Sequence, residues 1–207
     1  SALTLLTAVE VRGGRLAETE EAFPLSADYI RAAAGKTNEK SAEQSVCGLY
    51  ALLLLLRRVG ADTRGLRLSR TEKGKPYFVG SGYKFSIAHS SSVAVASLSD
   101  AETGVDVELL RPKPDAAALA ARFFTREEAE YVAASPDKSR AFFRVWTRKE
   151  ALIKRDGTGT DMRLDLTDTT KERFTEPSVV CGGEYLVCAT GEAEYIATEL
   201  TVAGRSL

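Results

Sequence analysis

The sequence lacks the marks of membrane, secreted and nucleic-acid-binding proteins. Its longest apolar run, residues 46–56, ends at Arg57 and is much shorter than the roughly 20 residues that cross a bilayer. The 28 Lys and Arg side chains nearly cancel the 29 Asp and Glu side chains, so a polyanion would need a local basic patch. The first residues show no basic segment followed by an apolar core, the pattern of a secretion signal. We therefore expect a cytoplasmic protein with no membrane or nucleic-acid partner.

Cysteine and histidine are also scarce. The three cysteines are an odd number, and Cys181 and Cys188 are seven positions apart, which places them on opposite faces of a regular strand. We expect reduced thiols and no zinc site. The single histidine, His89, is expected in the serine-rich turn 89–92, where an exposed anion contact and a plain turn residue are both reasonable interpretations.

The order of apolar and polar segments predicts an α+β fold with two similar halves. The first half contains an expected strand at 3–11, helices at 26–34 and 39–59, and strands at 66–69, 83–88 and 93–98. The second half contains a strand at 105–110, helices at 115–122, 126–134 and 136–155, and strands at 163–166, 172–174, 185–189 and 195–202. The opening strands, and the glycines that close the long helices, each recur about 100 residues apart. We predict two pseudo-symmetric halves, residues 1–102 and 103–207.

Two carboxylates share one face of the strand that opens the second half. In the segment 104–108, Val105 and Val107 face one side of the strand, and Asp106 and Glu108 face the other. A solvated strand edge could tolerate this pair of like charges. The alternative is a site for a hard cation, because oxygen ligands suit Mg²⁺.

The long helix of the second half carries charges close to its apolar stripe. Lys149 falls inside the stripe, and Glu150 and Lys154 lie one turn apart on its half-buried edge. Alone, the latter two would be read as an ordinary surface pair. Together with Asp106 and Glu108 they predict a site for Mg²⁺ and a polyphosphate, where the metal and the lysine neutralise charge during phosphoryl transfer.

Several segments together resemble a known family. The turn Gly74-Lys75-Pro76 could by itself be a simple turn or one that holds a ligand. The resembling segments, in the family's order, are 74–76, 85–90, 104–108, 122–128, 146–154 and 157–159. They are similar to the 4′-phosphopantetheinyl transferases, in the long monomeric form that activates peptide and polyketide synthases.

The resemblance implies a fold and an activity. The fold would be that of the transferase family, with the active site between the two halves of a monomer. The activity would be that of a holo-[acyl-carrier-protein] synthase type enzyme. It would move the 4′-phosphopantetheine group of coenzyme A to a serine of an apo acyl or peptidyl carrier protein, with Mg²⁺ bound, and release adenosine 3′,5′-bisphosphate.

The resemblance also implies residue roles. Asp106, Glu108 and Glu150 would hold Mg²⁺, and Lys154 would contact the transferred phosphate. Glu150 is the first candidate for the general base and Glu128 the second. Phe123 and Phe124 would lie near the carrier's docking surface.

Coenzyme A would contact a second group of residues. His89 and Ser45 would meet its 3′-phosphate, and Gly74, Lys75 and Pro76 would meet its adenine end. The sequence departs from the family at Ala88, where a serine is usual, and at Gln44, where an arginine is common. Lys36 or Lys40 could supply the missing charge.

These departures keep two alternatives open. The first is a non-catalytic module that binds coenzyme A or a carrier protein with the same fold. The second is a Mg²⁺-dependent phosphohydrolase that acts on a nucleotide diphosphate.

Overall fold

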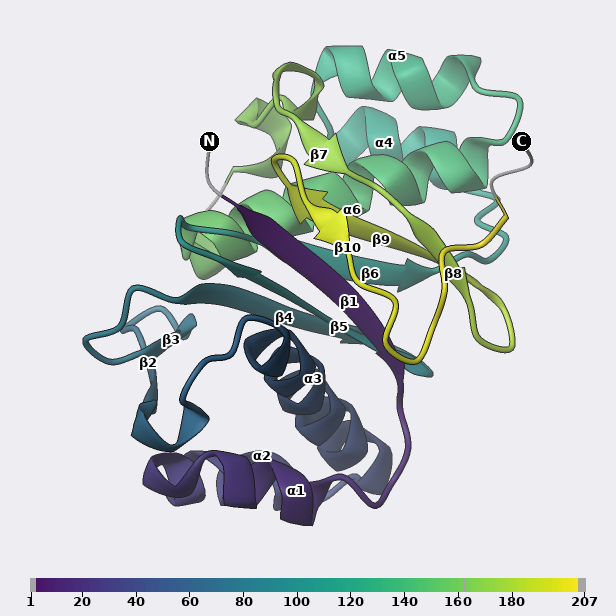
Figure 1. Cartoon of the computed structure of the whole chain (residues 1–207). Coiled ribbons are helices and arrows are strands. Elements are labelled where there is room, and N and C mark those ends of the chain that lie inside the picture. The colour runs from purple at the N-terminus through teal and green to yellow at the C-terminus, as the bar shows by residue number, and fades with distance from the viewer. Residues whose placement is uncertain (1–2, 162, 205–207) are drawn as a thin grey trace.

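Two β-sheets pack face to face, and helices cover the outer face of each (Figure 1). The computed structural model describes residues 3–161 and 163–204. Helices α1–α3 lie on one side of the paired sheets and helices α4–α6 on the other. The α+β fold predicted from the sequence is confirmed.

The first part of the chain builds one sheet and its helical cover. Its elements are β1 (Thr4–Glu10), α1 (Leu16–Ala22), α2 (Ala27–Ala34), α3 (Glu39–Arg58), β2 (Leu68–Arg70), β3 (Pro76–Phe78), β4 (Lys84–Ser90) and β5 (Val93–Ser99). The sheet has the strand order β10-β1-β5-β4, and β5 is antiparallel to both β1 and β4. Strands β2 and β3 form a separate two-stranded ribbon.

The second part repeats the arrangement of strand, helices and antiparallel strands. Its elements are β6 (Val105–Leu109), α4 (Ala116–Phe123), α5 (Arg126–Ala134), α6 (Lys138–Asp156), β7 (Phe174–Thr175), β8 (Ser178–Val180), β9 (Glu184–Thr190) and β10 (Glu194–Tyr195). Strand β9 pairs with β6, β7 and β8, each antiparallel. Short 3₁₀ turns are η1 (Pro24–Ser26), η2 (Thr63–Gly65), η3 (Gly159–Asp161), η4 (Leu164–Leu166) and η5 (Thr169–Lys171).

Alternation along the strands divides the core between layers. Val105 and Val107 of β6 pack between the sheets with Leu6 and Val95 of the first sheet, whereas Asp106 faces α6, because neighbouring side chains on a strand point to opposite faces. The outer face of the first sheet packs on the leucine-rich stripe of α3. This alternation is what turns the carboxylates of β6 toward α6.

Side-chain caps fix the ends of the helices that carry the site. The side chain of Asn38 accepts a hydrogen bond at the start of α3, and that of Asp137 does so at the start of α6. Thr125 and Glu128 form a capping box at the start of α5. Helix α6 ends at Gly157, whose φ of 66° is left-handed.

The C-terminal segment departs from the sequence-based expectation. The sequence predicts a strand at 195–202. The structure instead has the two-residue strand β10, Glu194–Tyr195, which pairs parallel to β1. Farther on, Val202 bridges to Val179 of β8. The segment thus joins the first sheet, and the division at residues 102 and 103 stays a prediction.

The expected strand at 163–166 is instead the 3₁₀ turn η4. Thr167 donates its hydroxyl proton to the carbonyl of Arg163, and Asp168 caps the next turn. Such local side-chain bonds to the backbone favour turns over strand pairing. Helix α1 and strands β3 and β8 were not expected from the sequence. Among the described residues, no helix is long and apolar enough to cross a membrane.

Helix α6 approaches β6 so closely that only glycine fits at position 104. A Cβ atom there would lie 1.8 Å from the carbonyl oxygen of Ala151 and 2.6 Å from the amide nitrogen of Arg155. Both contacts are with helix backbone, which cannot move aside as a flexible side chain can. Gly104 therefore sets the distance between α6 and the strand of carboxylates.

We expect Gly104→Ala to destabilise the protein because the added methyl group overlaps the backbone of α6. The cost is about 3 kcal/mol or more, or roughly 6–12 °C in melting temperature. Thermal unfolding followed by circular dichroism measures it. Gly82→Ala is the matched control, because a Cβ there has no neighbour within 4 Å. Equal melting temperatures for the two variants would contradict the close approach.

Candidate functional site

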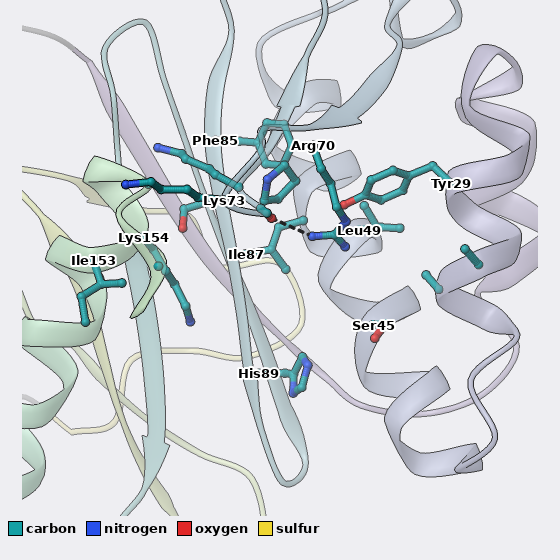
Figure 2. A pocket seen from close by; sticks show the side chains of 18 of the residues that line it. Tyr29, Ser45, Leu49, Arg70, Lys73, Phe85, Ile87, His89, Ile153 and Lys154 are labelled. Carbon is teal, nitrogen blue, oxygen red and sulfur yellow. Dashed lines mark hydrogen bonds between the residues drawn. The ribbon is translucent and has the colours of Figure 1, made fainter. Parts of the chain in front are cut away.

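A pocket of about 550 Å³ opens between the two helical covers (Figure 2). Helices α2 and α3 form one wall, β4 and the β2–β3 turn form the floor, and the end of α6 forms the other wall. The charged side chains that line the pocket are all basic: Lys36, Arg70, Lys73, Lys75 and Lys154. His89 lines the pocket as well. Among the described residues that line it there is no Asp or Glu, so the pocket favours an anionic ligand.

Two of these cations, one between α2 and α3 and one at the end of β2, are held by specific partners. The ammonium of Lys36 donates a hydrogen bond to the Ser45 hydroxyl at 2.6 Å. The guanidinium of Arg70 lies 5.0 Å from the centre of the Tyr29 ring and donates to the Gly74 carbonyl at 3.0 Å, the dashed line in Figure 2. Both groups are thereby ordered before any ligand binds.

Apolar side chains form the rest of the pocket wall. Leu49 of α3, Phe85 and Ile87 of β4 and Ile153 of α6 line it next to the cations (Figure 2). A ligand with both a flat apolar group and several phosphates suits a lining of this mixed character.

The structure brings together most of the residues predicted to bind coenzyme A. Ser45, Gly74, Lys75, Pro76 and His89 all line this one pocket. Their roles as ligand contacts stay predictions.

The structure places Gln44, one of the two departures from the family pattern, and the lysines considered as its substitutes. Gln44 does not line the pocket, because its side-chain amide donates to the Ser91 carbonyl in the β4–β5 turn. Of the two lysines considered as substitutes, Lys36 lines the pocket and Lys40 does not.

His89 lies in strand β4 rather than in the expected turn, which consists of Ser91 and Ser92. Desolvation lowers the pKa of its imidazole below the ordinary value, and the nearby ammonium groups of Lys154 and Lys36 lower it further. His89 is therefore mainly neutral at pH 7 in the free protein, with an N–H available to an anion.

Lys154 connects the pocket to the carboxylates of β6. It lines the pocket, and its ammonium lies 3.1 Å from Oδ1 of Asp106. Asp106 is only 6% exposed, and its Oδ2 is buried with no hydrogen-bond partner. Burial raises the pKa of Asp106 to about 7, Lys154 opposes the rise, and Glu150 and Glu108 add to it.

The other two predicted metal ligands lie in the same electrostatic neighbourhood. Burial raises the pKa of Glu150, Lys154 lowers it, and Glu108 raises it. Glu108 pairs with Arg111 at 3.1 Å. Asp106, Glu108 and Glu150 therefore repel one another, and only one oxygen of Asp106 is neutralised by Lys154.

The donor set fits Mg²⁺ in its chemistry but is not assembled into a metal site. Carboxylate oxygens and the unpartnered Oδ2 of Asp106 suit a hard cation. In the part of the chain that the structure describes, no three His, Cys, Asp or Glu side chains are grouped so that they could hold a metal ion. The ammonium of Lys154 neutralises Asp106 instead, and the metal assignment stays a prediction.

Glu128, the second candidate for the general base, does not belong to this site. It is 0% exposed, and its carboxylate accepts hydrogen bonds from the amides of Thr125 and Thr169. It also pairs with the ammonium of Lys149 at 2.6 Å, and that side chain is 0% exposed too. Burial by itself would raise the pKa of Glu128. Its hydrogen bonds, chiefly those from Lys149 and Thr169, outweigh burial and hold the pKa below its usual value. Glu128 is thus a structural carboxylate with no access to a substrate.

The two phenylalanines expected at a docking surface differ in exposure. Phe123 is 42% exposed at the end of α4. Phe124 is buried, and its ring lies 5.0 Å from that of Phe142. Of the two, Phe123 alone can meet a partner.

The sequence interpretation missed three residues that line the pocket: Tyr29, Arg70 and Lys73. The basic turn 70–75 was a usable signal for Arg70 and Lys73, because three of its six residues are basic. Tyr29 gave no comparable signal, since an aromatic residue in an amphipathic helix usually faces a core.

Comparison with known proteins finds one family, matched in the second part of the chain. Residues 102–203 match the model of the 4′-phosphopantetheinyl transferase superfamily. The 4′-phosphopantetheinyl transferase HetI of Nostoc sp. is 36% identical over 108 residues, which cover 49% of this chain and 46% of HetI. For AcpT of Salmonella typhi the identity is 40% over 103 residues, with 48% and 53% covered.

A third relative, Sfp of Bacillus subtilis, is 30% identical over 115 residues, which cover 54% of this chain and 50% of Sfp. The matched region thus spans about half the length of these curated relatives. Residues 102–203, which match the family model, contain β6 and α6 with their carboxylates Asp106, Glu108 and Glu150. Residues 102–203 of the chain belong to the 4′-phosphopantetheinyl transferase superfamily.

The raised pKa of Asp106 predicts a particular dependence of stability on pH. Between pH 3.8, the ordinary pKa, and about 7, the folded protein keeps a proton that the unfolded chain releases. The free energy of unfolding therefore falls as pH rises through this range, by on the order of 3 kcal/mol from this group. In metal-free buffer, we measure the melting temperature of Asp106→Asn minus that of the unmodified protein. We expect this difference to increase as the pH rises from about 5 to about 8. A difference that is constant with pH, as expected for the exposed control Asp100→Asn, would contradict the burial of this carboxyl group.

Lys149→Met should destabilise the fold because it leaves the Glu128 carboxylate buried without its cation. We expect a loss of about 3–5 kcal/mol in the free energy of unfolding, measured by urea denaturation. The double variant Lys149→Met/Glu128→Gln removes both charges and should recover part of this loss. Lys171→Met, at an exposed position, is the control. If the single variant were as stable as the control, the pair would not be a buried one.

Proposed function

We propose that this protein transfers the 4′-phosphopantetheine group of coenzyme A to a serine hydroxyl of an acyl or peptidyl carrier protein. The observation that carries the proposal is the junction at Lys154, which lines the basic pocket and pairs with a carboxylate of β6. The names of the relatives support the same reaction class.

Coenzyme A matches the pocket in its chemistry. Its 3′-phosphate and pyrophosphate need several cations, and its adenine needs a flat apolar wall. Lys36, Ser45 and His89 lie along one side and would take the 3′-phosphate. Arg70 and the turn that contains Gly74 would take the adenine end.

Asp106, Glu108 and Glu150 would hold Mg²⁺, which supplies positive charge to the pyrophosphate when it is bound. The raised pKa values of Asp106 and Glu150 support this assignment, because a cation would offset the burial that mainly raises them and the smaller repulsion from neighbouring carboxylates. The ammonium of Lys154 would contact the phosphate that is transferred and stabilise the charge that develops on it.

Glu150 is the proposed general base. The serine oxygen of the carrier forms the new bond to phosphorus, and the bond from that phosphorus to the departing adenosine 3′,5′-bisphosphate breaks. The proton of the serine hydroxyl goes to the Glu150 carboxylate, whose raised pKa improves it as a proton acceptor.

The carrier would dock close to the exposed end of α4. Phe123 offers an apolar contact there, and the guanidinium of Arg122 lies 4.9 Å from its ring centre. Arg144 and Arg148 are less suitable for an acidic partner, because both pair with Glu176. The pocket is lined by residues from both parts of a single chain, which supports a monomer.

The test is a transfer assay with purified protein, coenzyme A, Mg²⁺ and a panel of apo acyl and peptidyl carrier proteins. Intact mass spectrometry should detect the added phosphopantetheine on at least one carrier. Absence of addition to every carrier would overturn the proposal. Binding of coenzyme A without transfer would favour a non-catalytic module, and its hydrolysis without a carrier would favour a phosphohydrolase.

Variants separate the roles within the site. Asp106→Ala should abolish transfer at ordinary Mg²⁺ concentrations. Lys154→Ala should lower kcat about 10²–10³-fold with a smaller change in KM, because charge stabilisation in the transition state is lost. Lys138→Ala, at the exposed opposite end of α6, is the control. Full rates for Asp106→Ala and Lys154→Ala would refute the assignment of the site.

A further inference from the structure

The side chain of Lys75 is committed to contacts within the protein. Its ammonium donates hydrogen bonds to Oε2 of Glu102 at 2.7 Å and to the carbonyl oxygen of Arg155 at 2.6 Å. The side chain is only 14% exposed. Glu102 lies in the β5–β6 connection and Arg155 in the last turn of α6, so one ammonium joins the β2–β3 turn to two other segments.

Packing brings the same segments together. A Cβ at Gly157 would lie 3.2 Å from Cδ of Lys75, and a Cβ at Gly159 would lie 3.5 Å from the carbonyl oxygen of Lys73. These distances show that the chain leaving α6 lies directly against the β2–β3 turn. Glycine is favoured at both positions because φ is positive there. The turn and the end of α6 touch across the mouth of the pocket.

The contact has an electrostatic reason. The last carbonyl groups of an α-helix have no partner within the helix and carry partial negative charge. The ammonium of Lys75 satisfies one of them at Arg155. The neighbouring residue, Lys154, reaches Asp106 from the same turn of α6. Whatever fixes this turn therefore also fixes Lys154.

We propose that Lys75 is a positioning residue: its ammonium clasps the β2–β3 turn to Glu102 and to the end of α6, and thereby holds Lys154 in place, instead of contacting a phosphate of the ligand. The inference rests on the proposed function only in taking coenzyme A as the ligand. The clasp itself exists in the protein without a ligand.

Glu102 distinguishes the clasp from a direct phosphate contact. If Lys75 bound a phosphate, Glu102→Ala would free its ammonium and remove a negative charge near an anionic ligand, so coenzyme A would bind more tightly. If Lys75 is a clasp, Glu102→Ala and Lys75→Met both loosen the end of α6. We then expect both to weaken binding about three- to tenfold in calorimetry, the size of effect typical of a partly exposed ion pair with a helix-end contact.

Lys84→Met is the matched control. Lys84 also faces Glu102, at 3.8 Å, and the substitution makes the same change in charge. Because no hydrogen bond to α6 is lost, we expect its coenzyme A affinity and kcat to stay within about twofold of the unmodified protein. Lys75→Met and Glu102→Ala should lower kcat as well as affinity, since Lys154 shifts.

Hydrogen exchange in the absence of any ligand tests the clasp independently of the proposed function. Amides of residues 153–157 should exchange faster in Lys75→Met and Glu102→Ala than in the unmodified protein and in Lys84→Met. Lys75→Arg, which keeps a cation able to reach both acceptors, should restore slow exchange. If the unmodified protein did not bind coenzyme A, the proposed function would be wrong. The hydrogen-exchange rates would still test whether Lys75 holds the end of α6. Unchanged exchange in Lys75→Met, or tighter binding in Glu102→Ala, would overturn it.

Discussion

The close contact of helix α6 with strand β6 is the constraint on which the site depends. The strand turns Asp106 and Glu108 outward because Val105 and Val107 occupy the space between the sheets. Gly104 then allows the helix backbone to approach to a distance that any Cβ would forbid. The charged groups of α6 and β6 are thereby forced into one partly buried layer. Burial there, and to a smaller extent the neighbouring carboxylates, makes Asp106 hold its proton more tightly than in water.

A near-neutral chain can still contain a strongly basic pocket, because folding separates charges that are mixed along the sequence. The pocket collects cations from the connection between α2 and α3, the β2–β3 ribbon and the end of α6, while the carboxylates of β6 lie outside its lining. Lys154 lies at the boundary between the two. This segregation explains how a protein with a formal charge of −1 can have a strongly basic pocket directly beside a layer of carboxylates.

The charge at Lys149, which disturbs the apolar stripe of α6, is explained by a complete polar network. Its ammonium meets Glu128 and the carbonyl groups of Leu164 and Thr167, and Glu128 in turn holds Thr169. Every partner is satisfied, which is the condition under which a buried ion pair can be tolerated. The network ties the irregular segment 163–171 to α5 and α6, so a segment without strand pairing still takes up one conformation.

The helices and strands, and the faces on which their side chains lie, could be predicted from the sequence, because periodicity and capping act between neighbours in the chain. Helix α5 begins and ends at the residues that the sequence pattern predicts. The facing of Asp106 and the position of Lys154 one turn after Glu150 follow from strand and helix geometry alone. Contacts between distant segments could not be predicted from the sequence. The turn at 163–166, the pairing of β10 with β1, the burial of Glu128 and the engagement of Lys75 all depend on partners that lie far away in sequence. The sequence by itself determined which chemical groups the chain carries and on which face of each element they lie. Only the tertiary structure decided which of them meet, because burial and charge pairing arise when distant elements pack together.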